Sequence, residues 1–338
     1  MLHFFDNDCV GEKVKKIITR QRRDRVRGAI VGAAIGDALG MPAEGFHPRS
    51  IKKYYGKIRE FRNPNPEKSF HKLRKGQWTD DTQLMLAIGE SIVDKKCIDY
   101  YDIAKRHVEL YNEKRGWGKS TRQSVERMLG GMNWWEAGEP NGAGNGPPMK
   151  IAPLGILYEK YPEFDVNTAI INISRMTHQD PRPAIAAILQ AQAVRIALNG
   201  TVRDIKFYLR ESYKLAKKVE EGFFGGEKVN RLSIVIKKAF LLKNLGPTVL
   251  RKRIGARCYI NQSFPLTHVM VYKYCFNSAL CLKKIVNLGG DADTTGAMAG
   301  AIVGALNGFS SFPEKWIEEL EQSERLLELA DNLWRLTI

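Results

Sequence analysis

The chain has 338 residues, 43% of them hydrophobic, and its 53 Lys and Arg against 37 Asp and Glu give a formal net charge of +16. Five scattered cysteines, odd in number and without a Cys-x-x-Cys pair, exclude a disulfide framework and a zinc site and favour a reducing compartment. No signal core is present and no apolar run reaches the roughly 18 residues of a membrane span, so we expect a cytoplasmic protein without membrane contact.

Residues 1–24 are expected to form a basic N-terminal extension, followed by a single domain over 25–338. Positive charge is concentrated in residues 13–27 and 237–257. This predicts attraction to anions such as nucleic acid, acidic proteins or phosphate-bearing small molecules, although a solvated face is the plain alternative. The second half of the extension is moderately amphipathic and predicts a surface helix or an arm, for which a passive tail is preferred over a nucleic-acid contact.

Two runs of glycines at four-residue spacing stand near opposite ends of the chain, from Gly28 to Gly40 and from Gly296 to Gly308. Glycine costs about 1 kcal/mol relative to alanine inside a helix, so such regular spacing needs a packing reason. We predict that these two helices lie in close contact. That contact would bring Asp37 and Glu44 near the acidic residues that precede the second run.

The first acidic turn is Thr79-Asp80-Asp81, placed directly before the apolar run 84–92. Asp80 and Gln83 have the spacing of an N-terminal capping pair, so an ordinary helix cap is one interpretation. Further along, Gly118-Lys119-Ser120 lacks the glycine that a phosphate-binding P-loop requires five positions earlier. Ser120 and Gln123 predict a capping box there instead.

Residues 138–153 are rich in glycine and proline. On composition they are either a linker between two halves or a loop whose exposed amides approach an anion. His178 stands just before an alanine-rich helix over 184–198, where a lone histidine is usually a capping or packing residue. Strand signals are almost absent, so the chain is expected to fold as an all-α, compact orthogonal helical bundle.

The second acidic turn contains Asp291, Asp293 and Thr294, flanked by glycines and followed by an apolar helix. Carboxylates that close repel each other, so a cation must lie between them or one must stay protonated. Capping of the following helix is again the plain alternative. Because both turns carry a surplus carboxylate, we predict that they form two halves of one site for Mg or Mn, which prefer hard oxygen ligands.

These motifs together resemble the ADP-ribosylglycohydrolase family, of the dinitrogenase-reductase-activating and ADP-ribosylarginine hydrolase type. The resemblance rests on Arg27–Gly40, Thr79–Asp81, Thr177-His178 and Gly289–Gly296, in the family's order, and covers roughly residues 25–310. It implies that residues 25–338 form an all-α domain of this family's type.

The resemblance also implies roles for individual residues. It implies two divalent cations, Mg favoured over Mn, clamping a ribose diol, with Glu44 or Asp80 relaying protons. Metal ligands are expected at Thr79, Asp80, Asp81, Asp291, Asp293 and Thr294. Substrate contacts are expected at Gly142, Gly144, Asn145, Gly146 and His178, the last facing the phosphates. Lys150 replaces the family's arginine, which keeps the charge and loses the bidentate fork.

The implied activity is hydrolysis that releases ADP-ribose from a modified target, favoured as an arginine N-glycosidic bond on a protein. A serine, O-acetyl-ADP-ribose or nucleic-acid-base linkage is open, as is a non-catalytic ADP-ribose-binding or structural relative. The expected partner is an ADP-ribosylated protein or another ADP-ribose conjugate, with nucleic acid left open by the basic surface. We expect a monomer.

Overall fold

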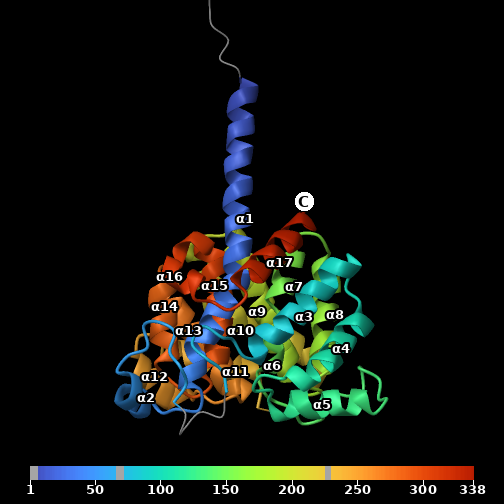
Figure 1. Cartoon of the computed structure of the whole chain (residues 1–338), viewed down its shortest axis with the longest axis vertical. Helices are drawn as coiled ribbons and strands as arrows, with labels where there is room; N and C mark the ends of the chain where they lie inside the picture. Colours follow the sequence, from blue (N-terminus) through green and yellow to red (C-terminus); the bar gives the residue numbers. More distant parts are fainter. Residues whose placement is uncertain (1–6, 66–71, 225–229) are drawn as a thin grey trace, which may run out of the picture.

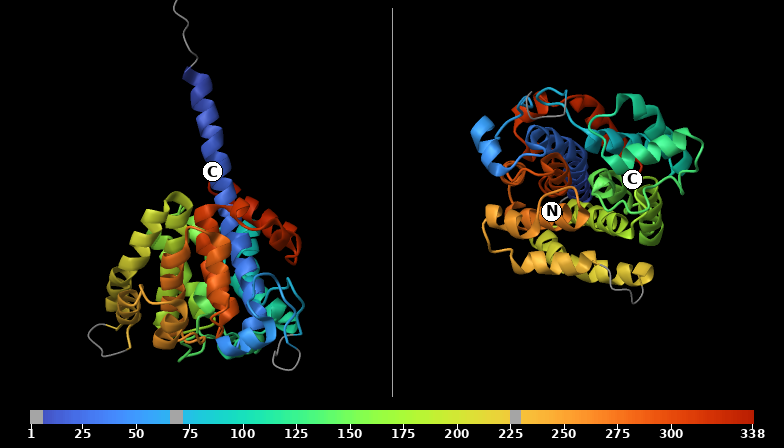
Figure 2. Two further views of the ribbon diagram at one scale, coloured as in Figure 1. Left: turned by 90° about the vertical axis from the view of Figure 1, so that its left-hand side faces the viewer. Right: turned by 90° about the horizontal axis from the view of Figure 1, so that it is seen from below.

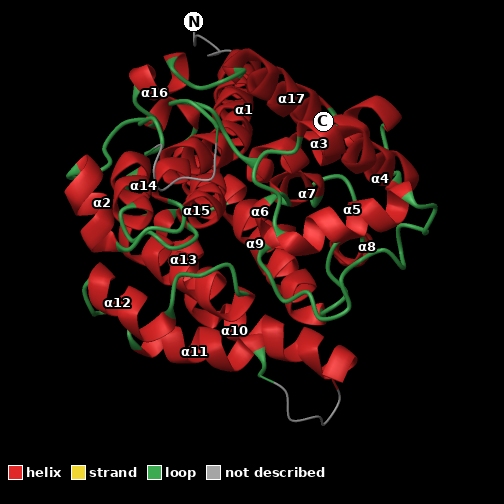
Figure 3. Cartoon of the chain, turned by 60° about the horizontal axis from the view of Figure 1, so that its bottom comes forward, coloured by secondary structure: helices red, strands yellow, loops and turns green. Residues whose placement is uncertain are grey.

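The computed structural model describes residues 7–65, 72–224 and 230–338, and residues 1–6 of the expected extension lie outside that range. Every regular element in the described residues is a helix, and the only strand-like contacts there are three isolated backbone bridges between loops. Figure 3 shows the helices joined by loops, and Figure 1 gives their order. The all-α bundle predicted from the sequence is confirmed.

The helices range from single turns to α1, which has 34 residues. In chain order they are α1 (Asn7–Gly40), η1 (Met41–Ala43), α2 (Pro48–Tyr55), α3 (Asp80–Lys95), α4 (Tyr100–Glu109), η2 (Leu110–Glu113), α5 (Lys119–Leu129), α6 (Gly146–Met149), α7 (Ala152–Leu157), α8 (Glu163–Arg175), α9 (Pro181–Asn199), α10 (Val202–Phe224), α11 (Leu232–Leu241), α12 (Pro247–Ile254), α13 (Ile260–Tyr274), α14 (Ser278–Val286), α15 (Ala292–Asn307), η3 (Phe309–Ser311), α16 (Glu314–Glu318) and α17 (Ser323–Arg335).

Helices α1 and α15 pack antiparallel, backbone against backbone. A Cβ placed on Gly36 would lie 2.0 Å from the carbonyl oxygen of Gly296, a distance that no real side chain tolerates. The facing pairs are Gly28 with Gly304, Gly32 with Gly300, Gly36 with Gly296, and Gly40 with Ala292. The predicted close contact is therefore confirmed. Gly308 follows the end of α15 with φ at +86°; its backbone also lies close to Gly28, while a Cβ built on it would meet the Asp24 carboxylate.

This pairing sets the two acidic regions side by side. The chain leaves the end of α1 through η1 and reaches Glu44, while Asp291 immediately precedes α15. Antiparallel packing brings those two points together, and α3 and α6 also pack against α15. Figure 1 shows these helix ends gathered at the lower end of the molecule.

The opposite end of the pair is tied down by ion pairs. Arg23 and Arg27 both bind Asp331 of α17, with Nε–Oδ1 distances of 2.9 and 2.7 Å, and hold the pKa of that carboxyl well below its usual range. The N-terminal part of α1 projects beyond the other helices (Figures 1 and 2). We place the boundary between the N-terminal extension and the domain after residue 24. Because α1 runs without a break through that residue, this boundary falls within a helix.

Helix α9 lies in the centre of the fold, where it packs against α6, α7, α8, α10 and α15 and is buried along most of its length. Both α9 and α15 are strongly apolar because protein surrounds them on nearly every side. Even so, none of the described helices combines the length and the hydropathy that crossing a bilayer would require.

Replacing Gly32 or Gly300 by valine should destabilise the fold severely, because a side chain at either position meets backbone or the Phe312 ring within 2.7 Å. Overpacking of this kind costs about 3 kcal/mol or more, so we expect the melting temperature to fall by at least about 5 °C. Gly222→Val is the matched control, since nothing lies within 4 Å of its Cβ position. A melting temperature for Gly32→Val equal to that of the control would reject the close-packing explanation.

Candidate functional site

The site is organised by Asp37, a fully buried residue of α1. Its carboxylate accepts hydrogen bonds from the backbone N–H and the hydroxyl of Thr79 (3.0 and 2.9 Å) and from those of Thr82 (3.1 and 2.6 Å). It thus caps α3 from another helix, while Thr79, the N-cap residue, makes no capping bond with its own side chain. Burial raises the pKa of Asp37 to about 6, against the lowering effect of these bonds.

This long-range cap leaves the carboxylates of the first turn free to meet the second turn. The hydroxyl of Thr294 lies 3.2 Å from Asp81 Oδ2, which also lies 3.1 Å from the hydroxyl of Thr79. The two acidic turns predicted to converge are therefore in direct contact. Neither Thr79 nor Asp291, the N-cap residue of α15, caps its own helix by a side-chain bond, so the plain capping interpretation is wrong for both turns.

Two buried carboxylate oxygens have no hydrogen-bond partner in the described structure, Asp81 Oδ1 and Asp293 Oδ1. Leaving such an atom unsatisfied costs several kcal/mol if it is charged, so native proteins rarely do so without a reason. Burial, followed by repulsion from neighbouring carboxylates, raises the pKa of both groups well above the ordinary value. These two oxygens are positioned to receive a cation.

Glu44 joins the same cluster. One oxygen from each of Glu44, Asp291 and Asp293 can be chosen so that the three lie within 4.8 Å of one another. Glu44 is held there by backbone bonds from Gly45 N–H to the Gly290 carbonyl (2.7 Å) and from Gly290 N–H to the Phe46 carbonyl (2.8 Å). Burial and then repulsion from Glu44 raise the pKa of Asp291 to about 7. All these donors are hard oxygens, which suits Mg or Mn.

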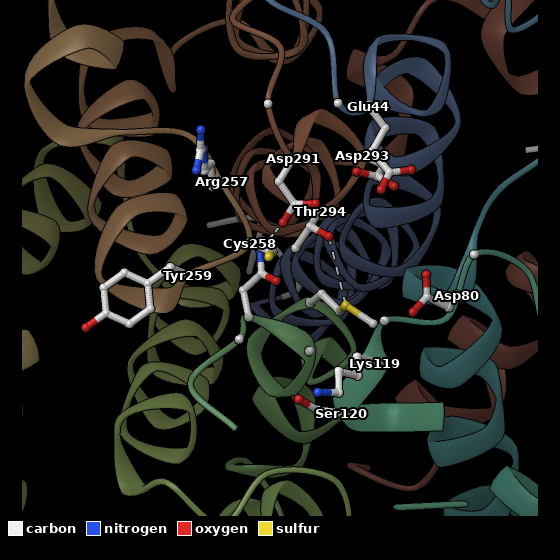
Figure 4. Close-up of a pocket in the computed structure, with 18 of the residues that line it drawn as sticks. Glu44, Asp80, Lys119, Ser120, Arg257, Cys258, Tyr259, Asp291, Asp293 and Thr294 are labelled. Atoms are coloured by element: carbon white, nitrogen blue, oxygen red, sulfur yellow. Dashed lines mark hydrogen bonds between the residues drawn. The ribbon is translucent and has the colours of Figure 1, made fainter. Parts of the chain in front are cut away.

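Asp80 lies on the α3 side of the same pocket (Figure 4), and its pKa is raised first by burial and then by Glu44. Behind it is Lys150, fully buried, whose Nζ lies 3.3 Å from Nε2 of the buried His107. Burial lowers the pKa of Lys150 to about 8, while attraction to Asp80 opposes that shift. The sequence does not identify His107 as part of the site, because its partner Lys150 lies 43 residues away along the chain.

The glycine-rich segment is built around His178. Cβ atoms on Gly142, Gly144 and Gly146 would lie 3.3, 3.2 and 2.7 Å from the imidazole ring. The absence of side chains at these three positions therefore lets the loop pack directly against His178. His178 is buried, its Nδ1 lies 2.8 Å from the Thr177 hydroxyl, and burial followed by Lys150 lowers its pKa to about 3. The segment therefore lines a pocket, and its interpretation as a linker is wrong.

Asn145 connects this loop to the acidic cluster, because its side-chain amide donates a hydrogen bond to Asp291. The pocket, which is open to solvent on one side, has a volume of about 990 Å³. All the residues predicted for the site except Thr79, Asp81 and Gly142 line its wall. Thr79 and Asp81 lie just behind the wall, bonded as described above.

Several pocket residues were not predicted from the sequence. They include Arg251 and the labelled residues Lys119, Ser120, Arg257, Cys258 and Tyr259 (Figure 4). Arg251 and Arg257 belong to the basic run of residues 237–257. The sequence shows the charge of that run but does not indicate where in the fold it lies. Helix α5 starts at Lys119 after Gly118 as N-cap and has no side-chain cap, so the capping box predicted for Ser120 and Gln123 is wrong.

Comparison with known proteins gives a consistent result. A family model described as ADP-ribosylglycohydrolase matches residues 19–338. An ADP-ribosyl-dinitrogen reductase glycohydrolase of Rhodospirillum rubrum is 28% identical, over 88% of this chain and 90% of that protein. An ADP-ribosylarginine hydrolase of Serratia proteamaculans, Tri1, is 29% identical over 92% and 79%. A solved structure titled ADP-ribosylglycohydrolase-related protein complex superposes with a TM-score of 0.72 at 29% identity, covering 94% of this chain and all of that one.

The metal-free protein should lose stability as the pH rises from 6.5 to 8. Folding raises the pKa of Asp291 to about 7 and raises that of Asp80, Asp81 and Asp293 well above the ordinary 3.8, so these carboxyls bind more protons folded than unfolded and each rise in pH favours unfolding. The window starts at 6.5 because His107, His178 and His268, with pKa lowered to about 3, oppose the trend below it, and it ends at 8 because Lys150, with its pKa lowered to about 8, opposes the trend above it.

Thermal melting in a chelator at pH 6.5, 7.2 and 8.0 measures this effect. Mg or Mn should flatten or reverse the slope, because cations bind the deprotonated carboxylates. Asp291→Asn should weaken the slope in chelator. A melting temperature that rises with pH in the metal-free protein would contradict the electrostatic description of the cluster.

Proposed function

The chain belongs to the ADP-ribosylglycohydrolase family and is a hydrolase of glycosyl bonds in ADP-ribose conjugates, and on this premise we propose that it cleaves the arginine N-glycosidic linkage of ADP-ribosylated protein. The proposal includes two divalent cations, Mg favoured over Mn. The observation that carries the metal dependence is a pair of buried oxygens without a hydrogen-bond partner in the described residues, one on Asp293 in the pocket wall and one on Asp81 just behind it. The arginine linkage draws support from the name of the Serratia relative.

We divide the ligands between two positions that share Asp293. Glu44, Asp291 and Asp293 would hold one cation, since their oxygens already cluster within 4.8 Å. The other would be held by Asp80, Asp81, Asp293 and the hydroxyls of Thr79 and Thr294. When bound, divalent cations supply Lewis-acid polarisation of substrate and water oxygens and neutralise the carboxylate repulsion.

The remaining pocket residues fit the rest of the substrate. ADP-ribose carries an anionic diphosphate, and Lys119, Arg251 and Arg257 supply the positive charge of the pocket wall. His178 is neutral because its pKa is lowered to about 3, so it offers the phosphates a ring nitrogen and no charge. Tyr259 also lines the pocket, next to Gly144, to which its backbone is bridged.

Bond cleavage requires a water to attack the ribose C1″ as the bond from C1″ to nitrogen breaks and positive charge develops on the sugar. Glu44 and Asp80 both line the pocket, and the N-cap position of α3 is occupied by Thr79 and not by Asp80. One of them takes the proton from the attacking water, whose oxygen bonds to C1″, and passes it to the leaving nitrogen as the bond from C1″ to nitrogen breaks, so that the carboxylate is regenerated. The clustered carboxylates stabilise the positive charge that develops on the ribose.

Asp291→Asn and Asp80→Asn should each lower the rate of ADP-ribose release by at least about 10²-fold while leaving the fold intact. Removing one carboxylate from a mutually repelling buried cluster relieves repulsion, so the melting temperature in chelator should hold steady or rise. Release of free ADP-ribose from an ADP-ribosylated arginine substrate is the measurement. Asp165→Asn, an exposed acid on α8, is the matched control. Wild-type rates in both pocket variants would refute the assignment.

Chelation followed by dialysis should abolish activity, and adding Mg or Mn should restore it. A panel of arginine-, serine- and O-acetyl-linked substrates assayed with the restored enzyme then tests the linkage separately. Full activity after metal removal would overturn the metal dependence. Preference for an oxygen-linked substrate would overturn the arginine assignment and leave the metal dependence standing.

A further inference from the structure

A strongly basic surface borders the pocket on the side of α2. Arg49, Lys52 and Lys53 follow the i, i+3, i+4 spacing of one helix face, and all three are exposed. Lys57 and Arg59 continue the series past the end of α2 and are also exposed. Lys52, Lys57 and Arg59 together line a hollow of about 590 Å³ beside the pocket.

A second basic segment borders the pocket from α12. Lys252 and Arg253 occupy its last turn and Arg257 follows it, all exposed. The two segments are connected through the turn after α14, because Arg251 Nε donates to the Leu288 carbonyl (2.6 Å) while Gly289 packs against Phe46 and Ile51. Figures 1 and 3 show α2 and α12 as neighbours. We call Arg49, Lys52, Lys53, Lys57, Arg59, Lys252, Arg253 and Arg257 the basic rim.

The rim charges are not neutralised by ion pairs within the part of the chain that the structure describes. None of the eight side chains forms an ion pair with a carboxylate of the described residues, whereas Arg106, Arg195 and Arg325 elsewhere on the surface do. The sequence from 246 to 262 contains no acidic residue, and the described stretch 45–65 contains only Glu60, which is paired with Lys315. Of the eight, Arg257 lines the pocket itself, and the others extend the positive potential over α2, α12 and the residues that follow them.

The composition of the rim identifies the class of partner. Protein–protein interfaces are depleted of lysine and use buried aromatic anchors, whereas interfaces with nucleic acid are far more positive and contact mainly phosphates. Half of the rim residues are lysines, and Val249 is the one strongly exposed large apolar side chain on α2 and α12. Charge complementarity therefore favours a polyanion with regularly spaced phosphates over an acidic protein surface.

We infer that the basic rim binds nucleic acid and presents an ADP-ribose attached to a strand to the pocket. The presentation step rests on the hydrolase activity of the proposed function and extends it from an arginine linkage to a linkage on nucleic acid, whereas binding to the strand does not depend on it. Because every rim contact is to backbone phosphate, binding is independent of sequence and strongly dependent on salt. Six phosphate contacts on a single strand would give a log–log salt slope of about −4.

Fluorescence anisotropy with a labelled, unmodified 20-nucleotide single strand tests the binding. The quadruple variant Lys52→Glu, Lys53→Glu, Lys252→Glu, Arg253→Glu should bind at least about 10-fold more weakly at 100 mM salt, with a shallower slope. Lys105→Glu with Lys160→Glu, two exposed lysines on the α4 and α8 side, measures the effect of charge reversal away from the rim. Equal losses per reversed charge in both variants, or no binding by the wild type, would overturn the inference.

Hydrolysis assays separate this inference from the proposed function. The quadruple variant should release ADP-ribose from the small substrate ADP-ribosylarginine at the wild-type rate, and from an ADP-ribosylated oligonucleotide at least about 10-fold more slowly. If the wild type hydrolyses neither ADP-ribosylarginine nor the ADP-ribosylated oligonucleotide, the proposed function is rejected. Strand binding is then decided by the anisotropy measurement. Equal rates of wild type and variant on the oligonucleotide would reject the presentation of a strand by the rim.

Discussion

The contact on which the site depends is the approach of α1 and α15 at backbone distance. Glycines on both faces remove the side chains that would separate the helices. Asp37 near the end of α1 can then reach the first turn of α3, and Glu44 can sit beside Asp291 and Asp293 at the start of α15. A single larger side chain in the seam would move these groups relative to one another, because packed helices do not deform continuously.

This arrangement concentrates negative charge where burial makes it costly. The protein holds each carboxylate by a different device: four hydrogen bonds to Asp37, a threonine hydroxyl from each turn at Asp81, and the Asn145 amide at Asp291. No such device holds Asp81 Oδ1 or Asp293 Oδ1. Two buried carboxylate oxygens are thus left without a hydrogen bond in the described residues, as expected of a site that exchanges stability for ligand binding.

Much of this could be predicted from the sequence, because the signals are local patterns. Glycine spacing predicted the helix contact, and the surplus carboxylates of two short turns predicted their convergence. The role of Asp37 as a cap could not be predicted, since a cap 42 residues away leaves no local spacing. Lys150 with His107, and the wall formed by Arg251, Arg257 and Tyr259, likewise depend on tertiary placement. The wrong capping box at Ser120 shows how little a local rule specifies when a glycine can begin the helix.

Charges of opposite sign occupy separate regions at the pocket, although the chain as a whole has a net charge of +16. Carboxylates occupy the buried floor, and unpaired cations stand outside it on α2 and α12. In the proposed function, the ribose of ADP-ribose lies toward the carboxylates and the diphosphate toward Arg251 and Arg257, which line the same pocket. In the inferred binding mode, a strand attached to the ribose follows the charges of the basic rim. The two proposals thus assign recognition of the sugar to the carboxylates and recognition of its carrier to the rim.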